Sequence, residues 1–251
     1  MPRKIVSTGR GGTGKSTFVA LSARYLRPPI LLIDLDPDLS LADMLGADFH
    51  REGKRTVCEV LYDVIAKRKS NVSPATTTHD LMESLLWSDS LYEGRKFDLI
   101  TLGTKLTEGC YCAPDDLLRK TISKLSRSYT NVMVDSPAGV EHLNRNIVSD
   151  IDDLFVLCDP SQKSLKHVAR IRDIIKQVGM RCSHFYLVAD YEFDDVTEER
   201  LRHSGEVYLG KVDYDTNVER YNLEGRSLLQ LPEDSPACVS VQRILAKAGY
   251  R

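Results

Sequence analysis

The chain has 251 residues, of which 42% are hydrophobic, and its 34 Lys and Arg and 36 Asp and Glu residues give a formal net charge of −2. That length suffices for one substantial core, predicted as a single domain over residues 1–251, and the near-neutral charge gives no overall field that would attract DNA or an anionic membrane. No apolar run approaches the roughly 18 residues of a membrane span, which favours a cytoplasmic protein with reduced cysteines.

Short apolar runs alternate along the chain with longer segments of helical periodicity. The predicted strands are residues 4–8, 30–34, 97–102, 131–135, 153–157, 184–188 and 206–210. The predicted helices are residues 15–26, 114–127, 164–178 and 236–248, with weaker patterns at 56–67 and 78–87. Continuous apolar strands that alternate with helices indicate an α/β fold, in which a mostly parallel sheet carries helices on both faces.

The segment between the first strand and the first helix matches the phosphate-loop pattern G-x-x-x-x-G-K-[ST] at every fixed position. Glycines let backbone N–H groups face phosphate oxygens, and the helix that follows points its positive end at the same anion. Lys15 is expected to reach the β- and γ-phosphates, and the Ser16 hydroxyl is the expected Mg²⁺ ligand. The alternative, a glycine-rich turn without a ligand, is disfavoured by the strand before the loop and the helix after it. The predicted nucleotide contacts are Gly9, Gly11, Gly12, Thr13, Gly14, Lys15, Ser16 and Thr17.

Acidic residues follow two of the predicted strands. Asp34 and Asp36 lie at the end of the second strand, and Asp135 ends the strand at 131–135. The carboxyl ends of parallel strands form the ligand crevice of such a sheet, and a carboxylate near the γ-phosphate is suited to position the attacking water. Each of these residues alone has a simpler interpretation as the cap of a turn. Together with the phosphate loop, they predict a Mg²⁺–nucleotide site.

The stretches GRGGTGKST, LLIDLDPD and VMVDSPAG resemble the phosphate loop, switch I and switch II of the MinD/ParA class of dimeric ATPases. Within that class, the stretches GCYCAP and AGVEHL resemble the CooC-type accessory ATPases of carbon monoxide dehydrogenase, which insert nickel. The resemblance implies a P-loop fold that binds ATP or ADP with Mg²⁺. It also implies that Asp36 orients the attacking water, that Asp34 and Asp135 lie in the outer shell of the metal, and that Gly139 contacts the γ-phosphate.

The chain departs from the family pattern at two places. The signature lysine of the family, which reaches the phosphates of the partner subunit, is replaced by Arg10. Arginine keeps the charge and can bind phosphate bidentately, so we expect a catalytic role for Arg10, the alternative being a plain surface arginine. Where relatives often carry an asparagine that reads adenine, Ala189 and Asp190 stand instead, which leaves the recognition of the base open.

Cys110 and Cys112 form a C-x-C pair. Two thiolates are half of a tetrahedral site, and a two-fold axis would supply the other half at a dimer interface. Thiolates suit Ni²⁺ or Zn²⁺, and an iron–sulfur cluster is also conceivable. The alternative is a pair of small buried hydrophobic residues, the common state of free cysteine. The resemblance favours the shared metal site.

Three functions from different classes remain. The first is an ATP-hydrolysing, homodimeric maturation factor that delivers nickel to a client such as carbon monoxide dehydrogenase or acetyl-CoA synthase. The second is a positioning or partition ATPase, which would require a basic or membrane-binding surface that the last predicted helix does not provide. The third is an iron–sulfur electron donor, which would have its cluster cysteines far apart in the sequence. We predict the first, with no nucleic acid or membrane partner.

Overall fold

The computed structural model describes residues 2–68, 84–104, 122–138 and 150–250. Its strands form one eight-stranded sheet in the order β3-β4-β2-β5-β1-β6-β7-β8. The strands are β1 (Arg3–Gly9), β2 (Ile30–Asp34), β3 (Tyr92–Glu93), β4 (Asp98–Thr101), β5 (Asn131–Asp135), β6 (Ile151–Cys158), β7 (Cys182–Ala189) and β8 (Val207–Lys211). The sheet is parallel except for β3, a two-residue edge strand that pairs antiparallel with β4.

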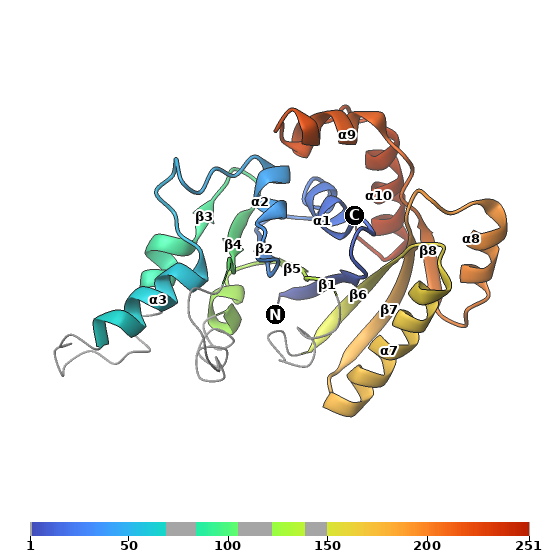
Figure 1. Ribbon diagram of the computed structural model, residues 1–251, viewed down its shortest axis with the longest axis horizontal. Helices are drawn as coiled ribbons and strands as arrows, with labels where there is room; N and C mark the ends of the chain where they lie inside the picture. The colour runs from blue at the N-terminus through green and yellow to red at the C-terminus, as the bar shows by residue number, and fades with distance from the viewer. Residues whose placement is uncertain (1, 69–83, 105–121, 139–149, 251) are drawn as a thin grey trace.

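Helices cover both faces of the sheet, as the sequence predicts (Figure 1). The helical elements are α1 (Lys15–Ser22), α2 (Ser40–Leu45), α3 (Val57–Arg68), the π-helix η1 (Leu86–Ser90), α7 (Gln162–Val178), α8 (Asp195–Arg202), α9 (Thr216–Leu223), the 3₁₀-helix η2 (Leu228–Gln230) and α10 (Pro236–Lys247). In Figure 1, α1, α2, α9 and α10 lie above the sheet, and α3 and α7 lie below it.

The alternation of side chains along each strand divides the core into two layers. In β1, Ile5 packs into the layer that contains Phe18 of α1, whereas the next residue, Val6, packs into the layer that contains Val60 of α3 and Ile171 of α7. All of these side chains are almost fully buried. Burial of one such side chain contributes about 1.5–3 kcal/mol, which explains why the central strands are apolar on both faces.

The seven predicted strands are all present, with ends that shift by one or two residues. The prediction missed only β3 among the described strands, since two residues carry no periodicity. The helices predicted at 164–178 and 236–248 are confirmed as α7 and α10, and the weaker pattern at 56–67 is α3.

Other helix predictions need correction. The helix predicted at 15–26 ends at Ser22, and a turn follows it. The pattern at 78–87 is described only from residue 84, where residues 84 and 85 are α-helical and a π-helix begins at Leu86. Most of the helix predicted at 114–127 lies outside the described residues, although residues 122–126 are helical.

Three short helices, α2, α8 and α9, are absent from the prediction. Leu201 is the only fully buried residue of α8, and Tyr221 is the only one of α9, so neither helix has an apolar stripe. The capping residues of α8 and α9 are the signals that would have revealed these two helices. Asp194 and Thr197 form a reciprocal capping box at α8, and the side chain of Asp215 accepts from the backbone of Asn217 at α9.

The strand order brings three carboxyl ends together in the middle of the sheet. β5 lies between β1 and β2, and Asp135 is in register with Asp34 on one side and with Ser7 on the other. The loop between β1 and α1 therefore begins beside two acidic strand ends. This edge of a parallel sheet is where ligands bind.

Within the described ranges, no helix is long and apolar enough to cross a membrane.

Candidate nucleotide site

The loop from Gly9 to Gly14 requires glycine at two positions for identifiable reasons. Gly9 has φ +151°, and a Cβ atom there would lie 2.4 Å from the carbonyl oxygen of Leu157 in β6. Gly14 adopts the left-handed conformation, with φ 77°, directly before α1. No side chain caps the N-terminus of α1. Its first N–H groups are therefore available to an anion, as the phosphate-loop prediction requires.

Lys15 is the first residue of α1, and its side chain is almost buried. Its Nζ atom donates to the carbonyl oxygen of Arg10 at 2.9 Å, which places the ammonium inside the curve of the loop. Burial lowers the pKa of Lys15, while the carboxylates of Asp135 and Asp36 oppose that shift. No carboxylate of the described residues is bonded to this ammonium, and a positive charge in such a desolvated position attracts phosphate strongly.

Asp34 and Asp135 are fully buried at adjacent strand ends. One oxygen of Asp34, Oδ1, accepts from the backbone N–H of Asp36 at 2.9 Å. Among the described residues, the other Asp34 oxygen and both oxygens of Asp135 have no hydrogen-bond partner. Burial raises the pKa of Asp34 to about 8 and that of Asp135 to about 7. The charge of Asp135 contributes to the first shift, and the nearby Ser16 hydroxyl and the charge of Lys15 oppose the second.

These unpartnered carboxyl groups fit a bound Mg²⁺ ion. Buried polar atoms without partners are rare and costly, whereas a divalent cation with its water shell would satisfy them. Mg²⁺ is usually held by one or two protein oxygens together with substrate phosphates, which matches Ser16 as a ligand and Asp34 and Asp135 as acceptors around it. When bound, the ion would neutralise charge on the phosphates.

Asp36 begins the segment that joins β2 to α2. Its carboxylate is only partly buried, and Oδ1 accepts from the backbone N–H of Asp38 at 3.1 Å. Its own N–H donates to Asp34, so the two acidic residues are connected by a direct hydrogen bond. A substitution that removes the Asp34 carboxylate would therefore remove an acceptor for the backbone of Asp36.

The segment after β5 also approaches the phosphate loop. Ser136 donates from both its backbone N–H and its hydroxyl to the carbonyl of Ser7, at 3.1 and 2.6 Å. The Cβ atom of Ala138 lies 3.7 Å from the position that a Cβ on Gly11 would occupy. Gly139, predicted to contact the γ-phosphate, is outside the described residues, as are Cys110 and Cys112.

Arg10 forms an ion pair with its own chain. Its Nη1 atom lies 2.7 Å from Oδ2 of Asp159 and donates to the Ser161 hydroxyl at 3.0 Å, at the carboxyl end of β6. The side chain remains about one-third exposed (35%). A role for Arg10 on the phosphates of a partner subunit therefore requires that this ion pair opens.

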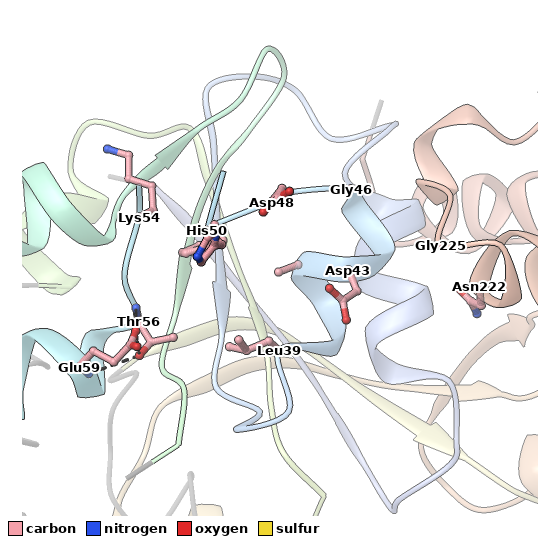
Figure 2. Close-up of a pocket in the computed structure, with 13 residues that line it drawn as sticks. Leu39, Asp43, Gly46, Asp48, His50, Lys54, Thr56, Glu59, Asn222 and Gly225 are labelled. Carbon is pink, nitrogen blue, oxygen red and sulfur yellow. Dashed lines mark hydrogen bonds between the residues drawn. The ribbon is translucent and has the colours of Figure 1, made fainter. Parts of the chain in front are cut away.

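Two hollows in the described part of the chain differ in their position relative to the phosphate loop. The larger, about 750 Å³, lies between α2, the start of α3 and α9, and no residue of the phosphate loop lines it (Figure 2). The smaller, about 230 Å³, is lined by Gly12, Thr13, Gly14 and Thr17. The smaller hollow therefore adjoins the loop predicted to bind nucleotide, and the sequence motifs did not identify its other walls.

The cysteines that the structure describes make no metal site. Cys158 and Cys238 are fully buried, and burial raises the pKa of the Cys158 thiol to about 12, which agrees with a structural role. In the described part of the chain, no three His, Cys, Asp or Glu side chains are grouped to hold a metal ion.

Asp34→Asn is expected to stabilise the nucleotide-free protein at pH 8 by roughly 1–2 kcal/mol. A carboxyl group whose pKa rises from about 4 to about 8 on folding favours the folded state at low pH, and this contribution is lost as pH rises through the folded value. Urea unfolding should therefore give a wild-type stability that falls from pH 5 to pH 8, and a weaker fall in the variant. Asp38→Asn, at an exposed neighbour, is the control; equal slopes in Asp34→Asn and wild type would contradict the assignment.

The sheet order, the loop and the paired carboxyl groups together define a P-loop NTPase fold of the MinD/ParA type. A family model described as "AAA domain" matches residues 4–185, more than half of the chain, and the protein belongs to this family.

The relatives extend over nearly the whole chain. An uncharacterized ATP-binding protein of Methanocaldococcus jannaschii is 29% identical over 250 residues, with 97% of each chain covered. The carbon monoxide dehydrogenase accessory protein CooC of Rhodospirillum rubrum is 27% identical, over 94% of this chain and 91% of its own. The resemblance to a P-loop ATPase family is confirmed, while the narrower CooC assignment stays a prediction.

Solved structures agree in fold. A ParA family ATPase from Chlorobium tepidum superposes with a TM-score of 0.72 at 17% identity, covering 96% of this chain and 98% of that one. The MinD cell division protein of Aquifex aeolicus gives a TM-score of 0.68 at 19% identity, covering 98% and 96%. At this identity the likeness establishes the architecture alone.

Proposed function

We propose that the protein is a Mg²⁺-dependent ATPase that works as a nucleotide switch. The observation that carries this proposal is the set of buried carboxyl oxygens of Asp34 and Asp135 without partners, beside Lys15 at the mouth of a phosphate loop. Lys15 binds the β- and γ-phosphates, Ser16 and the two carboxyl groups hold the ion and its waters, and Asp36 orients the attacking water.

The switch is proposed to act through a homodimer that closes around ATP. Arg10 would leave its ion pair with Asp159 and bind the phosphates of the partner subunit, as an arginine finger does. The site is complete without Arg10 for binding, but the developing negative charge of the transition state lacks that cation until the dimer forms.

Arg10→Ala is therefore expected to reduce ATP-dependent dimerisation and ATP hydrolysis by at least about tenfold, because the charge supplied in trans is lost. Binding of ADP by the monomer should stay within about threefold of wild type. Sedimentation with and without ATP, beside steady-state hydrolysis, measures both effects. Arg27→Ala, at an exposed arginine outside the loop, is the control. An unchanged rate of ATP hydrolysis and unchanged sedimentation in Arg10→Ala would show that Arg10 is a surface residue without a role in the dimer.

We further propose that the client of the switch is a nickel enzyme of the carbon monoxide dehydrogenase or acetyl-CoA synthase type. The support is the similarity to CooC of Rhodospirillum rubrum along nearly both chains, together with the Cys110 and Cys112 pair. The septum site-determining protein MinD of Thermotoga maritima matches only 70% of this chain and 58% of its own. The deciding experiment is activation of an apo nickel enzyme by this protein with ATP and Ni²⁺, with Lys15→Ala as the inactive control. Failure to activate, with DNA or vesicle binding instead, would favour the positioning class.

The cysteine pair should hold one metal per dimer, since each chain supplies two of the four thiolates that a closed site needs. Equilibrium dialysis with Ni²⁺ and with Zn²⁺, beside mass measurement by light scattering, tests this ratio. The double change Cys110→Ser and Cys112→Ser should abolish metal-induced dimers and leave nucleotide binding intact, and the same double change at Cys158 and Cys182 is the control. One metal per monomer, or tight binding in the double variant, would contradict a shared site.

A further inference from the structure

The hollow of about 230 Å³ beside the phosphate loop has the position of a base pocket. One wall is the loop and the start of α1, where the phosphates bind. The opposite walls come from the ends of β7 and β8 and from α9, and they include Asp190, Tyr191, Val212, Tyr214, Val218 and Glu219. Because the loop and these walls line the same hollow, a nucleotide whose phosphates lie on the loop would place its base against them.

Apolar and aromatic groups make the pocket suitable for a flat ring. The Tyr191 and Tyr214 rings contact each other with centroids 5.3 Å apart, and both are about half exposed. The Tyr214 hydroxyl donates to the Glu219 carboxylate at 2.9 Å, which fixes that ring. Val212 and Val218 supply aliphatic surface. Exposed tyrosines beside a pocket favour stacking with a base.

Asp190 follows β7 directly and is a buried charged residue on the wall of this pocket. It is 6% exposed, and its backbone N–H donates to the carbonyl of Cys158 at 2.9 Å. Its Oδ1 atom accepts from the N–H of Glu192 at 3.0 Å, which holds the carboxyl group in one orientation. Among the described residues no donor contacts its Oδ2 atom. Burial raises the pKa of Asp190 to about 6, so the group is mainly ionised at neutral pH.

We infer that Asp190 determines which base this site accepts, and that it admits guanine at least as well as adenine. An ionised carboxylate only accepts hydrogen bonds. Guanine presents two adjacent donors, the N1–H and the 2-amino group, and can satisfy both oxygens. Adenine presents one amino group beside a ring nitrogen whose lone pair faces the carboxylate unfavourably. The inference rests on the proposed nucleotide site but is independent of the client.

An asparagine at this position would reverse the preference. Its amide oxygen can accept from the adenine amino group while its NH₂ donates to the ring nitrogen, which is a matched pair. A site whose buried polar atoms match one base discriminates strongly against a base without the matching donors or acceptors. A buried polar atom of the site is then left without a partner.

The test is equilibrium binding of non-hydrolysable ATP and GTP analogues with Mg²⁺ to the full chain, by calorimetry. The wild type should bind the GTP analogue as tightly as the ATP analogue or more tightly. In Asp190→Asn, the ratio of the two dissociation constants should shift toward ATP by about tenfold to a hundredfold, the range for one bidentate pair. Glu192→Gln, which keeps the backbone N–H that bonds Asp190, should leave the ratio unchanged.

A second measurement needs no variant. Inosine triphosphate keeps the N1–H but lacks the 2-amino group, so it should bind the wild type about tenfold more weakly than GTP. A wild type that binds ATP a hundredfold more tightly than GTP, or an unaltered ratio in Asp190→Asn, would overturn the inference. In either case Lys15-dependent binding of ATP would leave the proposed function standing, whereas loss of all triphosphate binding in the wild type would remove both.

Discussion

Lys15→Ala is expected to weaken the binding of both ATP and ADP by at least about a hundredfold. The ammonium of Lys15 lies inside the loop, bonded to the Arg10 carbonyl, and a buried cation interacts with phosphate at low effective dielectric. Fluorescence titration or calorimetry with Mg²⁺–ATP measures the loss. Lys176→Ala, an exposed lysine in the last turn of α7, should bind as the wild type does.

The loss should not come from unfolding. Burial disfavours the charged form of Lys15, so removing the ammonium relieves a desolvation cost in the nucleotide-free protein. The thermal midpoint of Lys15→Ala without nucleotide should therefore be close to that of wild type, while the increase that nucleotide gives to the wild type should disappear. Binding within threefold of wild type would refute the assignment of the loop.

Asp36→Ala is expected to keep nucleotide binding within a few-fold of wild type and to reduce hydrolysis by about two to three orders of magnitude. Asp36 lies outside the loop and does not hold the phosphates, but it is bonded through its backbone to Asp34 and has a partly exposed carboxylate that can orient water. Single-turnover hydrolysis, started from preformed protein–ATP complex, separates this step from product release.

Asp38→Ala is the matched control for Asp36, since it removes an exposed carboxylate two residues away and keeps the N–H that bonds to Asp36. Wild-type turnover in Asp36→Ala would show that another group orients the water. Loss of binding together with hydrolysis would instead assign Asp36 to the cation shell beside Asp34.

The sheet was predictable from sequence because its strands are buried on both faces. Ile30 to Asp34 and Asn131 to Asp135 are buried at every position. Short apolar runs of this kind are typical of the central strands of a parallel sheet. The short helix α2 was not predictable in the same way. It begins after Leu39, a leucine with φ +56°, and has no capping side chain, so its start lacks both usual signals.

The candidate site was predictable to the extent that its chemistry is local in sequence. The glycines, Lys15 and Ser16 lie in one short segment, and the phosphate-loop pattern predicts the function of each. Spatial neighbours were harder to identify. The adjacency of Asp34 and Asp135 follows from β5 lying between β1 and β2, and the ion pair of Arg10 with Asp159 joins residues 149 positions apart. Neither contact produces a spacing of residues that can be recognised in the sequence.

The place of β1 in the sheet also determines when the protein can fold during synthesis. Of the described strands, β1 is synthesised first, yet its two neighbours, β5 and β6, end at Asp135 and Cys158. At the usual rates of elongation, the first strand and its loop wait on the order of ten to thirty seconds for both partners. Contacts of such long sequence separation form slowly even in the complete chain. Until then the nascent apolar strand is exposed, and no nucleotide can stabilise it, because Asp135 has not yet joined the site. Stalling translation before Asn131 should therefore leave an N-terminal segment that proteases cleave with or without ATP.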